Sequence, residues 1–225
     1  MKNKIMFMLL PVLLLTGCQK STKENTPTSK IKSSLTTKSQ PEKTKLAEKR
    51  EKFITQGTLS QKDKEKLAQM SISAFGDSIM EGCRDDYQTL FPKIQIDAGV
   101  SRQVGSVIGE LQSKPLTNTI LIGLGTNGPF SQSQFDQIMH IIGTKREVYF
   151  INTNVDQDWQ EEVNDMLSSG SKRYSNVHVI DWNNYSAGHE NWFWDGIHPN
   201  IQGRQIMVDF VGRNIIADEK YYLNK

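Results

Sequence analysis

The segment Ile72-Ser73-Ala74-Phe75-Gly76-Asp77-Ser78-Ile79-Met80 decides the fold, because it joins an apolar run to a helical pattern through Gly-Asp-Ser. The run Ile72–Phe75 predicts a buried strand, and the pattern that follows Ser78 predicts a helix over Ile79–Leu90. Gly76 would allow the sharp turn between the two. A strand that leads directly into a helix is typical of a parallel sheet whose faces are covered by helices.

The same alternation continues to the end of the sequence. Four more strands are predicted, at Ile94–Asp97, Thr119–Gly123, Val148–Asn152 and His178–Asp181. Four more helices are predicted, at Gln103–Gln112, Gln132–Ile142, Trp159–Leu167 and Ile201–Ile216. We therefore expect an α/β fold, a three-layer α/β/α sandwich with a five-stranded parallel sheet. Ligands of such sheets bind at the loops beyond the carboxyl ends of the strands.

The charge is distributed unevenly along the 225 residues, although the formal net charge is only +2. Residues 1–70 contain 15 basic and 6 acidic residues, a net charge of +9. Residues 71–225 contain 12 basic and 19 acidic residues, a net charge of −7. The near-neutral net charge argues against a nucleic-acid-binding protein, but the sum conceals a basic arm joined to an acidic body.

The first residues have the features of a secretory signal. Two lysines precede an apolar run of 11 residues, Ile5–Leu15, which is too short for a membrane-spanning helix of about 20 residues. The run ends in Leu15-Thr16-Gly17-Cys18, which resembles the lipobox of bacterial lipoproteins. That resemblance implies a signal peptide over residues 1–17, a lipid on the sulfur of Cys18 and an extracytoplasmic protein anchored to the cell membrane. An ordinary cleaved signal is the alternative.

A polar segment separates this signal from the rest of the chain. Gln19–Lys45 consists mainly of Ser, Thr, Lys, Gln and Pro, and it has too little apolar surface to offset the entropy of ordering. We therefore predict a disordered basic stalk over residues 18–58, with a short helix at Leu46–Phe53. Its lysines would hold it near anionic lipid or wall polymer, or it is a plain spacer. The globular domain is expected over residues 59–225.

The sequence contains two cysteines, Cys18 and Cys83. If Cys18 carries a lipid, Cys83 has no partner in the chain and no disulfide forms. Only Arg84 is close enough in sequence to stabilise a thiolate, so Cys83 is predicted to be a small packed thiol.

Three predicted strands are followed by residues that suit acyl transfer. Ser78 would have its hydroxyl in the crevice and its N–H at the start of a helix, although Asp77 or Ser78 could simply cap that helix. Gly99, after the second strand, could offer an N–H to a substrate oxygen. Asn127, in Gly-Leu-Gly-Thr-Asn-Gly after the third strand, could donate its amide to the same oxygen or belong to an Asn-Gly turn. The glycine spacing lacks the nucleotide-binding patterns.

The segment Asp195-Gly196-Ile197-His198-Pro199 precedes the last predicted helix. An Asp three residues before a His can hold the imidazole in one tautomer, which leaves the other ring nitrogen free to take a proton from serine. Helix capping is one alternative, and a metal site that adds His189 to Asp195 and His198 is another. No second cluster of metal ligands supports that site, so we expect no metal and no cofactor.

Four of these residues, taken in order, resemble the blocks of the SGNH (GDSL-type) hydrolase family, which is named for Ser, Gly, Asn and His. They are Ser78, Gly99, Asn127 and His198, and the resemblance extends roughly from residue 72 to residue 216. It implies a flavodoxin-like fold and a catalytic triad of Ser78, His198 and Asp195. It also implies an oxyanion hole formed by the N–H groups of Ser78 and Gly99 together with the Asn127 side chain.

Two departures from the family pattern narrow the resemblance. Gly128 follows Asn127 where the family usually has Asp, and Asp97 and Arg102 stand where Asn and Gly are common. The segments around Ser78, Gly99 and Asn127 read Gly-Asp-Ser-Ile-Met, Ile-Asp-Ala-Gly-Val-Ser-Arg-Gln and Gly-Thr-Asn-Gly. Together they look like the extracytoplasmic SGNH domain of peptidoglycan O-acetyltransferases. That likeness implies an esterase or O-acetyltransferase acting through an acyl-enzyme on Ser78, with cell-wall glycan or a small acyl ester as substrate.

The sequence leaves several points about partners open. A transferase would need a membrane partner to supply acetyl groups outside the cell, whereas an esterase would need none. A non-catalytic, envelope-binding lipoprotein on an SGNH scaffold is the alternative function. We expect a monomer that does not bind nucleic acid. Trp192 and Trp194, in the segment before Asp195, either stack on sugar rings or pack the loop that carries the predicted Asp195 and His198 pair.

Overall fold

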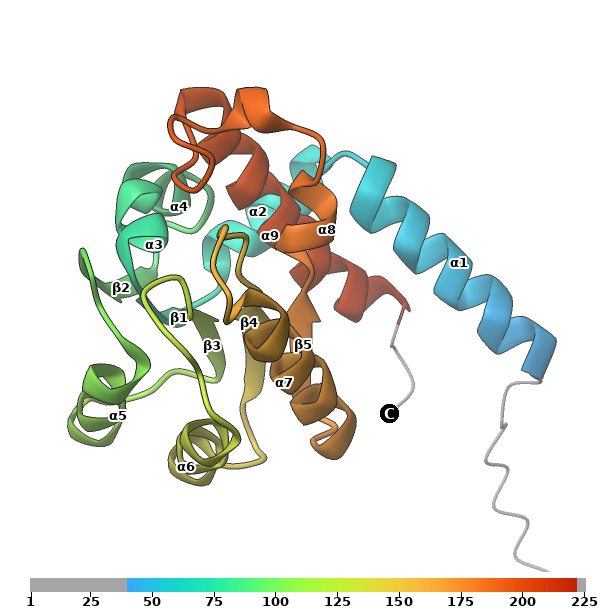
Figure 1. The fold of residues 1–225 in the computed structure, drawn as a ribbon. Helices are drawn as coiled ribbons and strands as arrows, with labels where there is room; N and C mark the ends of the chain where they lie inside the picture. The colour runs from blue at the N-terminus through green and yellow to red at the C-terminus, as the bar shows by residue number, and fades with distance from the viewer. Residues whose placement is uncertain (1–39, 222–225) are drawn as a thin grey trace, which may run out of the picture. The chain divides into compact units, whose positions relative to one another are not determined.

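A computed structural model describes residues 40–221 of the chain. The predicted signal peptide, Cys18 and the first part of the predicted stalk lie outside the described residues. Five strands form one parallel sheet in the order β2-β1-β3-β4-β5 (Figure 1). The strands are β1 (Ile72–Gly76), β2 (Ile94–Ala98), β3 (Thr119–Gly123), β4 (Glu147–Ile151) and β5 (Val177–Ile180). Each begins and ends within one residue of its predicted position, and the predicted fold class is confirmed.

The two faces of the sheet are covered by different sets of helices. Successive side chains of a strand point to opposite faces. In β3, Leu121 therefore belongs to one buried cluster, while Ile120 and Ile122 belong to the other. The second cluster lies under α5 (Val104–Ser113), α6 (Gln132–Ile142) and α7 (Gln160–Arg173). Strands β1, β3, β4 and β5 contribute side chains to both clusters, and β2 contributes Ile94 to the first. The sheet therefore lies between two layers of helices, as expected.

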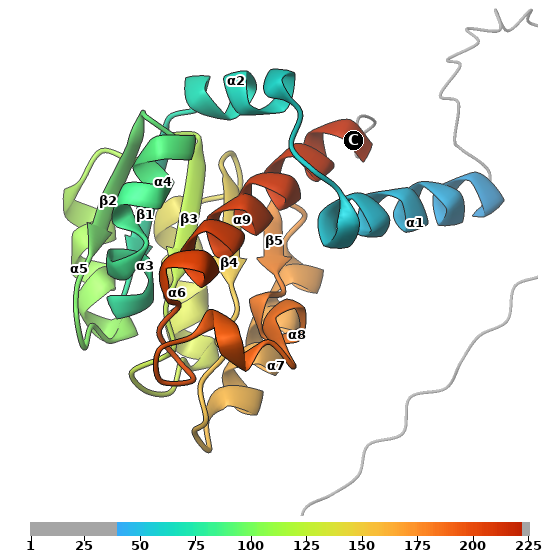
Figure 2. The ribbon, with the colours of Figure 1, turned by 90° about the horizontal axis from the view of Figure 1, so that it is seen from above.

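The first cluster is dominated by the C-terminal helix α9 (Ile201–Tyr221), which crosses one face of the sheet (Figure 2). The other elements on this side are α1 (Gln40–Gln56), α2 (Gln61–Gln69), α3 (Ser78–Gly82), α4 (Arg84–Leu90), α8 (Trp182–Ser186) and the 3₁₀ helix η1 (Glu190–Trp192). Within residues 40–221, no helix combines the length and the apolar character needed to cross a bilayer.

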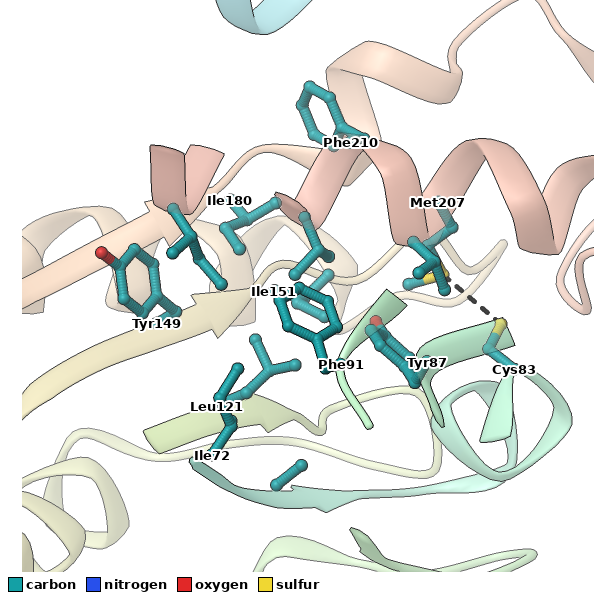
Figure 3. Close-up of a cluster of buried hydrophobic side chains, with 14 of the residues drawn as sticks. Ile72, Cys83, Tyr87, Phe91, Leu121, Tyr149, Ile151, Ile180, Met207 and Phe210 are labelled. Carbon is teal, nitrogen blue, oxygen red and sulfur yellow. Dashed lines mark hydrogen bonds between the residues drawn. The ribbon is translucent and has the colours of Figure 1, made fainter. Parts of the chain in front are cut away.

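The single helix predicted over 79–90 is wrong, because α3 ends at Gly82 and α4 begins at Arg84. Cys83, between the two helices, is fully buried, and its Sγ lies 3.9 Å from the Sδ of Met207 in α9 (Figure 3). Burial raises the pKa of the Cys83 thiol to about 12, so the thiolate is disfavoured. The prediction of a small packed thiol is confirmed.

Helix α1 is longer than the predicted helix at Leu46–Phe53, and it includes residues 40–45 of the predicted disordered stalk. The helix is held by contacts that are distant in sequence. Arg50 forms an ion pair with Asp218 of α9 at 2.6 Å, and Arg213 of α9 donates to the carbonyl of Ile54. The part of the chain packed on the sheet therefore begins before residue 59, where the sequence placed the domain boundary.

A cluster of ionisable side chains lies at the edge of the sheet where the strands begin. The Nε2 of His178 lies 2.7 Å from a carboxylate oxygen of Glu147, and its Nδ1 lies 2.9 Å from a carboxylate oxygen of Asp218. Burial lowers the pKa of His178, but the hydrogen bonds and charges of the two carboxylates raise it more, and the net direction is upward. Because Asp218 also pairs with Arg50, this cluster fastens α1 and α9 to the sheet.

Candidate active site

Three side chains form a hydrogen-bonded chain at the carboxyl end of the sheet. The Oγ of Ser78 lies 3.1 Å from the Nε2 of His198, and the Nδ1 of His198 lies 2.8 Å from the Oδ2 of Asp195. Ser78 opens α3, directly after β1, whereas the other two precede α9. Residues 120 positions apart are thus brought together in the arrangement in which a serine is activated by an oriented imidazole.

A tight loop holds the acidic member of the chain. The Oδ1 of Asp195 accepts the main-chain N–H groups of Ile197 at 3.0 Å and His198 at 2.8 Å, which leaves Oδ2 for the imidazole. The hydrogen bonds from the main chain and side chain of His198 lower the pKa of Asp195 to about 2. Gly196 supplies the φ of +85° that this turn requires.

The turn that carries Ser78 is anchored by Asp77. Its buried carboxylate accepts the N–H of Ile79 at 3.0 Å and so caps α3. Its main-chain N–H donates to the carbonyl of Gly123 at the end of β3, at 3.1 Å. Burial raises the pKa of Asp77, and hydrogen bonds from Ile79 and Thr126 oppose that rise only in part. The turn that carries Ser78 is therefore tied to the neighbouring loop that contains Asn127.

Gly99 lies at the site but does not present a free donor. Its N–H donates to the carbonyl of Gly76 at 3.3 Å, continuing the pairing of β1 with β2 for one residue beyond the strands. The main chain thus engages this N–H, and the role of Gly99 toward an oxyanion stays a prediction.

Asn127 bridges the loops that follow β2 and β3. Its Nδ2 donates to the carbonyl of Arg102 at 3.3 Å, and a primary amide has a second N–H to offer. Gly128, the departure from the family pattern, has a φ of +144°, a conformation that an Asp side chain would strain. The structure thus gives a conformational reason for glycine after Asn127.

The other departure forms a brace within the loop after β2. Arg102 and Asp97 are paired at 2.6 Å, with only 18% and 20% of their side chains exposed. The Nη1 of Arg102 also donates to the main-chain carbonyl of Asp97 at 2.7 Å, and Lys114 pairs with the same carboxylate. Burial raises the pKa of Asp97, but its hydrogen bonds with Lys114 and Arg102 outweigh this effect and lower it. From the sequence, Asp97 and Arg102 were recognised only as departures from the family pattern, and their ion pair was not predicted.

The two tryptophans before Asp195 have different surroundings. Trp192 stacks on His189 with ring centroids 3.8 Å apart and packs against the buried cluster under α9. Trp194 is 70% exposed, although its main-chain N–H donates to the carbonyl of His198 at 2.9 Å. Trp192 thus has the surroundings that the packing interpretation describes, whereas Trp194 is largely exposed to solvent. In residues 40–221, no group of three metal-ligating side chains is arranged to hold an ion.

Several known proteins resemble this chain in sequence. No family model matches the chain. O-acetyltransferase OatA of Staphylococcus aureus strain NCTC 8325 is 30% identical over 154 residues, which cover 66% of this chain and 25% of OatA. A provisionally named O-acetyltransferase of S. aureus strain MSSA476 is 34% identical over 140 residues, 60% of this chain and 23% of that protein. The predicted resemblance to O-acetyltransferases is confirmed.

Solved structures with the same fold include two enzymes. The C-terminal catalytic domain of peptidoglycan O-acetyltransferase A (OatA) from Streptococcus pneumoniae aligns with a TM-score of 0.58 at 18% identity, covering 69% of this chain and 96% of that domain. A family 3 carbohydrate esterase of Clostridium thermocellum aligns with a TM-score of 0.54 at 12% identity, and the alignment covers 68% of this chain and 98% of the esterase. The chain spans about a quarter of the length of the curated relatives that it matches.

Proposed function

We propose that the chain is a serine-dependent esterase or O-acetyltransferase that acts on acetyl esters of cell-envelope glycan through an acyl-enzyme on Ser78. The observation that carries the proposal is the hydrogen-bonded chain from Ser78 through His198 to Asp195. The names of the relatives, O-acetyltransferase and peptidoglycan O-acetyltransferase, support acetyl as the transferred group and wall glycan as the substrate.

In the first half of the reaction, the Oγ of Ser78 attacks the carbonyl carbon of the acetyl ester, and its proton passes to the Nε2 of His198. The charge of Asp195, 2.8 Å from Nδ1, stabilises the imidazolium that forms. The bond between the acyl carbon and the alcohol oxygen then breaks, and His198 gives the proton to the departing alcohol. The acetyl group remains on Ser78 as an ester.

Two donors would stabilise the negative oxygen of the tetrahedral intermediate. The N–H of Ser78 lies at the first position of α3, where helical N–H groups have no acceptor within the helix. The Asn127 amide has a second N–H beside the one given to Arg102. Removal of one such donor typically slows an acyl-transfer enzyme by about 10²–10³.

The second half of the reaction determines whether the enzyme is an esterase or a transferase. A hydroxyl, from water or from a sugar, gives its proton to His198 and attacks the acyl carbon, and the Oγ of Ser78 leaves and takes the proton back. Water yields acetate, whereas a sugar yields an O-acetyl glycan. Transfer in this direction needs an acetyl donor outside the cell, which a membrane partner would supply.

The proposal includes the location predicted from the sequence. Residues 1–17 would be removed as a signal peptide, and a lipid on Cys18 would anchor a monomer to the outer side of the cell membrane. The only support is the sequence Lys2 to Cys18. Globomycin, which blocks lipoprotein signal peptidase, should cause accumulation of the precursor. An unchanged protein mass and free release into the medium would contradict the anchor.

The catalytic part is tested by replacing the nucleophile. Ser78→Ala should abolish release of p-nitrophenol from p-nitrophenyl acetate and labelling by a serine-directed fluorophosphonate. Ser168→Ala, at an exposed serine on α7, is the matched control and should retain both signals. A folded wild-type chain that neither turns over the ester nor takes the label would instead support the non-catalytic, envelope-binding alternative.

A further inference from the structure

Three large apolar side chains in the described residues remain strongly exposed: Val100 at 77%, Trp194 at 70% and Ile201 at 60%. Each lies within three positions in sequence of a residue of the candidate site. Val100 follows Gly99, Trp194 precedes Asp195, and Ile201 comes three residues after His198. We call these three side chains the apolar rim. Large exposed apolar side chains that gather at one place mark an interaction site, whereas scattered ones need no explanation.

The rim residues come from two loops that meet at the nucleophile. Val100 belongs to the loop after β2, which is joined to β1 through the bond from Gly99 to Gly76. Trp194 and Ile201 flank the loop whose His198 contacts Ser78. Figure 1 shows both loops at the same end of the sheet as α3. The rim therefore lies at the end of the sheet that carries Ser78.

The cavity beside the turn that carries Ser78 is too small to enclose a sugar. This cavity, lined by Asp77, Tyr87 and Thr153 among others, has a volume of about 20 Å³, room for about one water molecule. The side chains of His198 and Asp195 are 44% and 53% exposed. A substrate must therefore lie across the surface, which suits a section of a long chain better than a small enclosed molecule.

The charges around the nucleophile do not favour an anion. Arg84 pairs with Glu81, Arg102 with Asp97 at 2.6 Å, and Arg204 with Asp86 at 3.6 Å. A phosphodiester or an anionic lipid headgroup would need such cations to be free. A pyranose ring, in contrast, has an apolar C–H face for an exposed indole and hydroxyls for a polar site.

We propose that the apolar rim is a surface subsite for an uncharged stretch of glycan, with a pyranose face stacked on Trp194 and the reacting oxygen at Ser78. This inference rests on the proposed function and adds the residues that would recognise the polymer. Val100 and Ile201 border the bound chain on the two sides. Trp192 does not take part, because its ring packs on His189 and the core.

The test measures binding without turnover. The full chain carrying Ser78→Ala is titrated with chitohexaose by calorimetry, alone and with Trp194→Ala, Trp194→Phe or His140→Ala added. Trp194→Ala should raise the Kd at least about tenfold, and Trp194→Phe should restore part of the affinity, because a smaller ring keeps some stacking area. His140, exposed on α6 at the opposite face of the sheet, is the control and should not change the Kd.

Three outcomes would overturn the inference. The first is that the Ser78→Ala chain does not bind chitohexaose, and the second is that Trp194→Ala leaves the Kd unchanged. The third is that the chain binds phosphatidylglycerol vesicles and that Trp194→Ala abolishes this binding while chitohexaose binding persists. The melting temperature of each variant shows whether it is folded. Turnover of p-nitrophenyl acetate by the unsubstituted chain tests the proposed function separately, so an active enzyme with no Trp194-dependent binding would refute only the rim.

Discussion

The two carboxylate oxygens of Asp195 have separable tasks, and Asp195→Asn should separate them. Oδ1 accepts two main-chain N–H groups that shape the loop, and Oδ2 accepts the imidazole Nδ1–H at 2.8 Å. An asparagine can keep its carbonyl oxygen at the first position and place its NH₂ at the second. The imidazole Nδ1 would then have to accept a hydrogen bond, and its proton would move to Nε2, the atom that must take the proton of Ser78.

The expected loss is large in rate and small in stability. The corresponding change in a serine protease triad lowers kcat by about 10⁴, which is about 5.4 kcal/mol of barrier. Asp195→Asn should therefore hydrolyse p-nitrophenyl acetate about 10⁴-fold more slowly at pH 7 with an unchanged melting temperature. Asp195→Ala should lose the rate and also about 1 kcal/mol of stability, because two exposed main-chain N–H groups lose their acceptor. For a domain of this size, that is about 2–4 °C.

Two results would refute this reasoning. A rate for Asp195→Asn within tenfold of the wild type would show that the tautomer of His198 does not limit catalysis. A melting temperature for Asp195→Asn as low as that of Asp195→Ala would show that Oδ1 does not hold the loop.

Two further predictions concern the brace and the ionisable cluster. Arg102→Ala should slow p-nitrophenyl acetate hydrolysis by about ten- to a hundredfold, because the loop after β2, whose Arg102 carbonyl accepts a hydrogen bond from Asn127, loses its ion pair. Arg173→Ala, which removes an exposed ion pair between α7 and α6, is the control. Equal rates in the two variants would contradict the role of the Arg102 ion pair. Because the pKa of His178 is raised on folding, its contribution to stability is fully present below about pH 6.5 and is lost as the pH rises through the folded value. The urea midpoint of the wild type should fall between pH 6 and pH 9, and that of His178→Gln should fall less. If the two midpoints changed in parallel with pH, His178 would make no such contribution to stability.

The sequence predicted the elements that depend on local pattern. Strands such as Thr119–Gly123 follow from apolar runs, and the helix Gln132–Ile142 follows from an amphipathic stretch, so the sequence located both correctly. Ser78, Asp195 and His198 could also be located from sequence, because each lies in a short motif at a strand end or a helix start. Sequence order alone places these motifs at one edge of a parallel sheet.

What the sequence missed depends on contacts between distant segments. Nothing near Gly99 indicates that its N–H is taken by Gly76, because that bond exists only once β1 and β2 pair. The composition of residues 40–45 predicts disorder, and the ion pair of Arg50 with Asp218, 168 residues away, helps to order the helix that includes them. The different surroundings of Trp192 and Trp194 likewise depend on which ring meets α9 and the core.

The length of α9 has a mechanical consequence. Its 21 residues extend about 30 Å, from the loop that carries His198 to the contacts of Asp218 with α1. A pull on the chain before Gln40 reaches the domain through α1, so the first load falls on the contacts at the far end of this rod. Peeling α1 away would break the pair of Arg50 with Asp218 and leave the opposite end of α9 in place. Under such a load, the contact between α1 and α9 would therefore break before the geometry around Ser78 is disturbed.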